Sequence, residues 1–251
     1  TIDAFIKIGF QNLPNIIWRK QTNAPNKFMG SGMLPPGAYV TLEHEYILIF
    51  RKGEKREFKT IDQKANRHKS SYFWEERNNL FSDLWELKGT NQKLIDKEAR
   101  ERSAAYPFKI AYRLINMYSV QDDCVLDPFL GTGTTSLAAI ASKRNSIGFE
   151  ILEELKPTIK KTILEKEMQM NTLIQGRIDK HKEFVKLRIS EKGADTFKHS
   201  NEYYNFPVMT TQEKGIKIPY IETIKSKSDA FEVKYSDKYI SNYISQKDLF
   251  N

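Results

Sequence analysis

The chain has 251 residues, which suits one large domain or two smaller ones. Hydrophobic residues make up 39% of it, and no stretch approaches the roughly 20 consecutive apolar residues of a membrane-spanning helix, so an integral membrane protein is excluded. The single cysteine, Cys124, excludes an intramolecular disulfide and a thiolate zinc cluster, and favours a reducing, cytoplasmic setting. Lys and Arg number 40 against 32 Asp and Glu, and this net charge of +8 favours polyanionic partners, above all nucleic acid.

The positive charge is concentrated in one segment. Residues 51–69 hold eight basic and three acidic residues, whereas residues 201–251 hold seven of each. A local excess is expected where one face of a protein meets a phosphate backbone, although a solvated basic loop is the alternative for any such run. The candidate phosphate-contacting residues are Arg51, Lys52, Lys55, Arg56, Lys64, Arg67 and Lys69.

Two β-branched and aromatic runs near the start predict strands, at residues 15–20 and 45–50. The stretch between them is rich in Gly, Pro and Asn, and it predicts a loop. Residues 54–101 are polar apart from an aromatic cluster, in which Trp74 and Trp85 are expected to be packing residues rather than base-stacking ones.

The second half of the chain alternates helical and extended patterns. Its predicted elements are helix 106–118, strand 124–127, helix 134–142, strand 146–150 and a mostly helical, highly charged stretch over 152–190. Beyond residue 193 only short, Tyr-rich pieces remain. Among the histidines, His44 is expected at a strand edge rather than in a metal site, and His181 and His199 are expected to be solvated.

The most informative segment is a Gly-rich turn that links a predicted strand to a predicted helix. Gly131 and Gly133 let the backbone turn tightly and approach a ligand, and the helix amino terminus attracts a carboxylate or phosphate. Glu150, at the end of the next strand, is placed to accept the hydroxyls of a ribose. The third Gly of the dinucleotide fingerprint is replaced by Ser136, and no P-loop Lys is present. The order of elements therefore predicts a nucleoside-cofactor site, with a structural turn as the alternative.

The sequence of this turn, Asp127-Pro128-Phe129-Leu130-Gly131-Thr132-Gly133-Thr134-Thr135, resembles the S-adenosylmethionine motif of DNA amino-methyltransferases from restriction–modification systems. The Tyr106-Pro107-Phe108 segment resembles the part of that family that covers the methionine end of the cofactor. Residues 15–20 and 43–53 resemble two of its late strands, in the segment order of the β class. The cofactor-binding residues that the resemblance implies are Tyr106, Pro107, Phe108, Asp127, Pro128, Phe129, Gly131, Gly133, Thr134, Thr135 and Glu150.

The resemblance also implies a fold and a function. The fold is α/β, the Rossmann-like fold of S-adenosylmethionine-dependent methyltransferases with a small target-recognition insert. The function is methyl transfer to the exocyclic amino group of cytosine (N4) or adenine (N6) in double-stranded DNA, in the prokaryotic cytoplasm and beside a cognate restriction endonuclease. The implied segments are late strands at 1–53, target recognition at 54–101, cofactor binding at 102–175 and an extension of unknown role at 176–251.

One departure from the family bears on activity. The catalytic tetrapeptide, in which Asp, Asn or Ser precedes Pro-Pro and an aromatic residue, is absent, and the only Pro-Pro lies in Leu34-Pro35-Pro36-Gly37. We therefore assign no catalytic residue. Because the β class carries that motif N-terminal to the segments seen here, and because the chain begins at Thr1 without Met, we expect a C-terminal portion with an incomplete sheet. Its expected partner is the missing N-terminal portion.

Two other functions stay open. The first is a non-catalytic DNA-binding or specificity subunit that keeps the cofactor fold, which the absent tetrapeptide favours. The second is a methyltransferase acting on RNA or a small molecule, which the expected recognition insert disfavours. Methylation at cytosine C5 is also disfavoured, because it needs a cysteine nucleophile and Cys124 is expected in the core of a strand.

Overall fold

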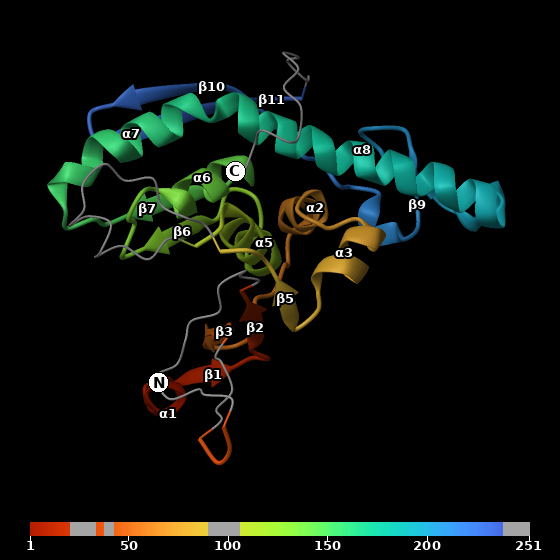
Figure 1. The fold of residues 1–251 in the computed structure, drawn as a ribbon. Coiled ribbons are helices and arrows are strands. Elements are labelled where there is room, and N and C mark those ends of the chain that lie inside the picture. Colours follow the sequence, from red (N-terminus) through yellow and green to blue (C-terminus); the bar gives the residue numbers. More distant parts are fainter. Residues whose placement is uncertain (21–33, 38–42, 90–105, 238–251) are drawn as a thin grey trace. The chain divides into compact units, whose positions relative to one another are not determined.

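The computed structural model describes residues 1–20, 34–37, 43–89 and 106–237. The chain divides into two compact units, each formed by two segments (Figure 1). Unit 1 comprises Thr1–Glu57 and Phe81–Pro107, and unit 2 comprises Phe58–Leu80 and Phe108–Asn251. The expected target-recognition segment, 54–101, is thus shared between the units, and its residues 90–101 lie outside the described part of the chain.

Unit 1 contains two small sheets. Helix α1 (Ile2–Lys7) precedes β1 (Phe10–Asn12), which pairs antiparallel with β4 (Phe50–Lys52). The other sheet has the order β3-β2-β5, with β2 (Ile16–Arg19) antiparallel to β3 (His44–Ile47) and parallel to β5 (Leu84–Glu86). Hence the predicted strand at 15–20 is confirmed, while the one at 45–50 is two strands, because the chain changes partner from β2 to β1 after residue 47.

Two buried tryptophans join β2 to β5 in the three-stranded sheet. Trp18 and Trp85 are opposite each other in the β2–β5 register and are 4% and 2% exposed. The Trp18 indole donates a hydrogen bond to the Leu87 carbonyl at 2.8 Å. Trp85 is therefore a packing residue, as expected, and His44 lies on edge strand β3, also as expected.

Unit 2 contains the unit of strand, helix and strand that the turn motif predicted. Strand β6 (Cys124–Asp127) runs parallel to β7 (Asn145–Gly148), and α6 (Thr134–Ala141) connects them. Helix α5 (Phe108–Tyr118) packs on α6, whose residues 135–141 are all buried. One face of the strand pair is thus covered, because the Ser146 hydroxyl reaches Ser136 of α6 at 3.2 Å.

The opposite face of the β6–β7 pair is open. Leu126 and its register partner Ile147 are 62% and 53% exposed, and Cys124 on the same side is exposed too. The expectation that Cys124 is a core residue is therefore wrong. Side chains alternate along a strand, and Cys124 alternates onto the side that no described element covers. The described strands form five separate small sheets.

A long helix and a hairpin complete unit 2. After the 3-10 turn Glu153–Leu155 come α7 (Lys156–Glu165) and the 26-residue α8 (Glu167–Lys192). The hairpin of β10 (Tyr220–Lys227) and β11 (Ala230–Ser236) packs along both helices (Figure 1). The predicted helical stretch over 152–190 is confirmed, whereas the hairpin lies where the sequence signals were weak. None of the described helices combines the length and the apolarity needed to cross a membrane.

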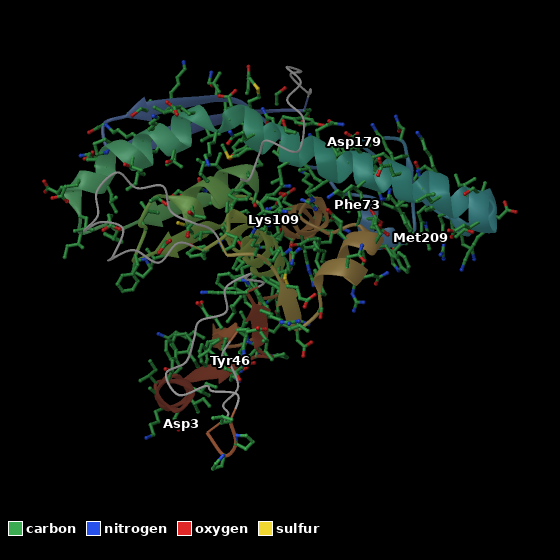
Figure 2. All side chains as sticks on the ribbon, in the orientation of Figure 1. Asp3, Tyr46, Phe73, Lys109, Asp179 and Met209 are labelled. Carbon is green, nitrogen blue, oxygen red and sulfur yellow. The ribbon has the colours of Figure 1, made fainter. Side chains whose placement is uncertain are left out.

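The main core of unit 2 joins residues far apart in the chain. Helices α2 (Ile61–Lys69) and α3 (Trp74–Leu80) come from the expected recognition segment, and β8 (His199–Ser200) and β9 (Pro207–Val208) form a short pair between the 3-10 turns Ala194–Thr196 and Thr211–Glu213. Phe73, immediately before α3, is fully buried (Figure 2). Its core cluster comprises Phe73, Ile174, Ile178, Phe206, Val208, Ile216, Ile218 and Tyr220. Residues 58–80 and the C-terminal extension therefore fold together.

Candidate cofactor site

The Gly-rich turn is built at the carboxyl ends of β6 and β7. The Asp127 carboxylate accepts a hydrogen bond from the Phe129 N–H at 2.9 Å, which bends the chain as it leaves β6. The Leu130 N–H donates to the Phe149 carbonyl at 2.8 Å and so ties the turn to the segment after β7. Gly133 then begins α6 with a φ of 87°, a left-handed conformation that glycine adopts readily.

Glu150 holds this turn with both carboxylate oxygens. One oxygen accepts a hydrogen bond from the Gly131 N–H at 2.8 Å, and the other accepts from the Leu152 N–H at 2.9 Å. Each carboxylate oxygen has two lone pairs, so Glu150 keeps acceptor capacity after these two bonds. The residue expected to bind a ribose therefore also positions the backbone of the turn.

The glycines in and beside the turn meet different structural requirements. A Cβ built on Gly131, whose φ is 56°, would meet no atom of the described residues within 4 Å. A Cβ on Gly133 would lie 3.4 Å from Ile159, and one on Gly148 would lie 2.7 Å from Leu130. Gly131 thus borders open space in which a ligand could lie, whereas Gly133 and Gly148 allow close packing within the protein.

Exposed apolar side chains surround the turn. Phe129 is 87% exposed, Phe149 is 61% exposed and Ile151 is 92% exposed. The amino terminus of α6 has no side-chain cap among the described residues, and helix amino termini attract anionic groups. The turn thus combines a carboxylate, an uncapped helix amino terminus and apolar surface, which suit the hydroxyl, carboxylate and ring groups of a nucleoside linked to an amino acid.

The other expected cofactor residues are placed as follows. Phe108 is the first residue of α5, stacks on Tyr112 with ring centroids 5.7 Å apart, and belongs to the helix that packs on α6. Pro107 is buried and Tyr106 is partly buried, directly before that helix. In α6, Thr134 is partly buried and Thr135 is buried, while Pro128 is exposed.

The basic run is divided by the fold. Arg51 and Lys52 lie on β4 in unit 1, where Arg51 bonds to Gln11 and the Lys52 ammonium lies 5.9 Å from the Phe10 ring centroid. Lys55 and Arg56 follow in the same unit and are exposed. The other three candidates lie on α2 in unit 2: Lys64 and Arg67 are exposed, and Lys69 is partly buried.

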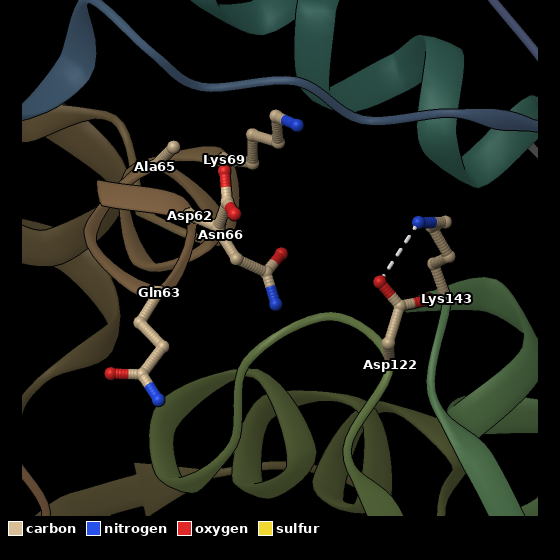
Figure 3. Close-up of a pocket in the computed structure, with 7 residues that line it drawn as sticks. All are labelled: Asp62, Gln63, Ala65, Asn66, Lys69, Asp122 and Lys143. Carbon is tan, nitrogen blue, oxygen red and sulfur yellow. Dashed lines mark hydrogen bonds and ion pairs between the residues drawn. The ribbon is translucent and has the colours of Figure 1, made fainter. Parts of the chain in front are cut away.

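Helix α2 lies near the amino ends of β6 and β7, whereas the turn is at their carboxyl ends. Lys69 lines a pocket of about 390 Å³ together with Asp122 and Lys143, which form an ion pair at 3.1 Å (Figure 3). Those two residues precede β6 and β7, so the pocket is at the amino ends of the strands. Asp127 and Glu150 lie at the carboxyl ends, the usual ligand-binding edge of such sheets. The α2 cations are therefore not next to the candidate cofactor site.

Sequence reasoning missed a buried polar region around α8. His181, expected to be solvated, is fully buried. It contacts Glu75 at 2.9 Å and stacks on Phe73 with ring centroids 4.1 Å apart. The flanking residues Lys180 and Lys182 are exposed and gave no signal of burial, whereas His199 is partly buried.

Arg177, one turn before His181, is another largely buried polar side chain on α8. Its guanidinium makes two hydrogen bonds to Glu76, at 2.7 and 2.8 Å, and one to the Tyr112 hydroxyl at 3.1 Å. Burial alone would lower the pKa of Arg177, but the Glu76 carboxylate outweighs it and raises the pKa above its ordinary value. This ion pair joins α3 to α8 and α5.

Comparisons with known proteins identify relatives of the chain. The family model described as DNA methylase, whose name refers to N6 and N4 methyltransferases, matches residues 1–161. The type II methyltransferase M.MthZI of Methanothermobacter thermautotrophicus is 53% identical over 239 residues, which are 94% of this chain and 65% of that protein. The type II methyltransferase M.MjaI of Methanocaldococcus jannaschii is 54% identical over 162 residues, which are 64% of this chain and 52% of that protein.

A solved structure agrees with these relatives. TTHA0409 of Thermus thermophilus, assigned as a DNA modification methylase and crystallised with S-adenosyl-L-methionine, aligns with a TM-score of 0.50 and 32% identity. The alignment covers 66% of this chain and 58% of that one, so the chain spans between half and two thirds of each of these three proteins. With the family model matching well over half of its residues, the chain belongs to the N6/N4 DNA methylase family.

Proposed function

We propose that this chain is the cofactor-binding portion of a type II DNA amino-methyltransferase that uses S-adenosylmethionine. The observation that carries the proposal is the turn at Gly131, with Glu150 clamping it and open space beside it. The name of the type II relative M.MthZI supports the reaction class, and the complex of TTHA0409 supports the choice of cofactor.

The residues present fit that cofactor. A ribose would lie against Glu150, which retains acceptor capacity, and the space beside Gly131 is one that a side chain would fill. The exposed Phe149 and Ile151 side chains would flank an adenine ring. Phe108, the first residue of α5, and the uncapped amino terminus of α6 would face the methionine end. When bound, S-adenosylmethionine supplies an electrophilic methyl group on a sulfonium.

The acceptor would be an exocyclic amino group in double-stranded DNA, N4 of cytosine or N6 of adenine. The lone pair of such a nitrogen is delocalised into the base ring, so attack requires acceptors that bond the amino group and an aromatic ring that stacks on the extruded base. The family tetrapeptide that would supply both is not in this sequence. This chain would therefore contribute cofactor binding and orientation, which account for much of the rate of such a transfer.

DNA contact is proposed for the exposed cations on both units. Lys52, Lys55 and Arg56 would act from unit 1, and Lys64 and Arg67 from α2. Arg51 and Lys69 are partly buried, so their share of phosphate contact would be smaller. A restriction endonuclease in the same system is proposed as a partner, in keeping with the type II relatives.

A second function, a non-catalytic DNA-binding or specificity subunit, is favoured by the absence of the tetrapeptide. Two measurements separate the alternatives. Calorimetry should show that the chain binds S-adenosylmethionine. Transfer of labelled methyl groups to double-stranded DNA should be absent with the chain alone, and should appear when the part of M.MthZI outside the matched region is added as a separate polypeptide. Cofactor binding without restored transfer would favour the specificity subunit, and absent cofactor binding would refute the proposal.

A further inference from the structure

We propose that Glu75, His181 and Glu213 form a binding site for one divalent transition-metal ion, with Zn²⁺ as the preferred ion. The three residues lie in different elements: Glu75 in α3, His181 in the middle of α8 and Glu213 in the 3-10 turn before β10. One ligand atom from each lies within 4.8 Å of the other two. The cluster is separate from the Gly131 turn and has no role in the proposed methyl transfer.

A backbone hydrogen bond fixes the tautomer of the His181 imidazole. Its Nε2 lies 2.9 Å from the Pro207 carbonyl oxygen, which can only accept a hydrogen bond, so Nε2 carries a proton. The neutral ring then has its lone pair on Nδ1, which faces the Glu75 carboxylate at 2.9 Å. A backbone carbonyl that fixes the tautomer in this way is common around metal-bound histidine.

The two carboxylates differ in how their oxygens are used. Glu213 is fixed, because one oxygen accepts from the Trp74 N–H at 2.8 Å and the other accepts from the N–H and hydroxyl of Thr210 at 2.7 and 2.8 Å. The first of these oxygens keeps a lone pair. One Glu75 oxygen, Oε2, is buried and has no hydrogen-bond partner among the described residues. An acceptor left unsatisfied in this way is costly unless a cation occupies the place of the missing donor.

The charges around the cluster also favour a bound cation. Glu213 is 1% exposed and His181 is fully buried. Among the described basic side chains, Arg177 pairs with Glu76 at 2.7 Å, and the Arg188 guanidinium lies over the Trp74 ring, 5.7 Å from its centroid. A proton on His181 would balance one of the two carboxylate charges, whereas a divalent ion would balance both. Buried charges are expected to be paired or bound to a metal.

The donor set selects the type of ion. One imidazole nitrogen and two carboxylate oxygens suit Zn²⁺, whereas Ca²⁺ and Mg²⁺ prefer oxygen ligands alone. Tetrahedral Zn²⁺ with bonds of about 2.0–2.2 Å places its ligand atoms roughly 3.3 Å apart. The Glu75–His181 separation is 2.9 Å, and the Glu213 ligand atom lies within 4.8 Å of the other two, so binding the ion would require side-chain rotations that bring all three to this spacing. The bound ion would connect α3 directly to α8 and to the turn before β10.

The site can be tested on the full chain, purified without a histidine tag. Elemental analysis should find about one zinc per chain, and a chelator should remove it and lower the thermal unfolding midpoint. Returning Zn²⁺ to the stripped chain should restore that midpoint, because an ion that binds only the folded state stabilises it. The exposed thiol of Cys124 can bind zinc adventitiously, so Cys124→Ser should retain zinc that is bound at the proposed site.

The discriminating variant is Glu75→Gln. An amide can still hydrogen bond to His181, so a purely hydrogen-bonded cluster would keep its metal-free stability in this variant. Zinc affinity, measured by competition with a chromogenic chelator, should fall at least about tenfold, as the loss of even an indirect metal-site partner does. Glu183→Gln, in an exposed position on α8, is the matched control and should leave the affinity unchanged. Zinc that is absent, bound equally by Glu75→Gln, or lost in Cys124→Ser would overturn the proposal.

Discussion

The sharpest test of the candidate cofactor site is Glu150→Gln. Glu150 accepts one backbone hydrogen bond on each oxygen, from Gly131 and Leu152. An amide keeps one acceptor and turns the other into a donor, which would then face a backbone N–H. A hydrogen bond to a charged group contributes about 1.5–3 kcal/mol, so we expect the free energy of unfolding to fall by about that amount.

The same change should weaken cofactor binding for a second reason. If the ribose hydroxyls bond to Glu150, the amide removes at least one of those bonds as well as the clamp on the turn. A loss of about 1.5–3 kcal/mol corresponds to roughly a 10- to 150-fold rise in the dissociation constant for S-adenosylmethionine. Glu154→Gln, at an exposed position in the following 3-10 turn, is the matched control and should change neither quantity.

Calorimetry with two ligands separates the ribose interaction from the clamp. The wild-type chain should bind an S-adenosylmethionine analogue that lacks the ribose hydroxyls more weakly than it binds the natural cofactor. The Glu150→Gln variant should bind the analogue and the natural cofactor about equally weakly. If removing the ribose hydroxyls weakens binding by the same factor in the wild-type chain and in Glu150→Gln, Glu150 only shapes the turn. An unchanged dissociation constant in Glu150→Gln would refute the assignment of the site.

Three further changes test other parts of the molecule. Gly131→Val should abolish measurable cofactor binding by calorimetry, because it fills the open space and strains a positive φ; binding within twofold of wild type would contradict this. Replacing Lys64 and Arg67 by Gln should reduce the salt slope of log K for DNA by about 0.9 for each phosphate that the protein no longer neutralises, and an unchanged slope in titrations at several salt concentrations would show a solvated helix face. Phe73→Ala should lower the free energy of unfolding by about 3–5 kcal/mol in urea titrations, since Phe73 is fully buried; a decrease under about 1 kcal/mol, well below that range, would show that this core is not cooperative with the rest of unit 2.

The parts that could be predicted from sequence are those that local chemistry determines. The turn from Asp127 to Gly133 is such a case, because a left-handed φ at Gly133 and a carboxylate that bends the chain at Phe129 are encoded within a few residues. The strand before the turn and the helix after it follow from hydrophobic periodicity. Glu150 was found because its distance along the chain from the turn matches one helix and one strand.

The parts that could not be predicted depend on contacts distant in sequence. The alternating pattern Ala230–Ser236 could have been a signal for β11, but Glu232 and Lys234 obscured it. The three-residue strand β5 is a strand only because Trp85 pairs with Trp18, 67 positions earlier. No local pattern specifies which distant segment will supply such a partner.

His181 shows most clearly how burial can be decided from outside an element. Its immediate neighbours in α8, Lys180 and Lys182, are charged and exposed, so the local sequence predicts a solvated helix at that point. On a helix, however, adjacent residues point in different directions, and the side of α8 that carries Ile174, Ile178 and His181 faces inward. A polar residue on a buried stripe needs a partner on the element that covers it, and here that partner is Glu75, 106 positions earlier. Because the core of unit 2 joins Phe73 to residues of the C-terminal extension, a destabilising change in either segment should also destabilise the other.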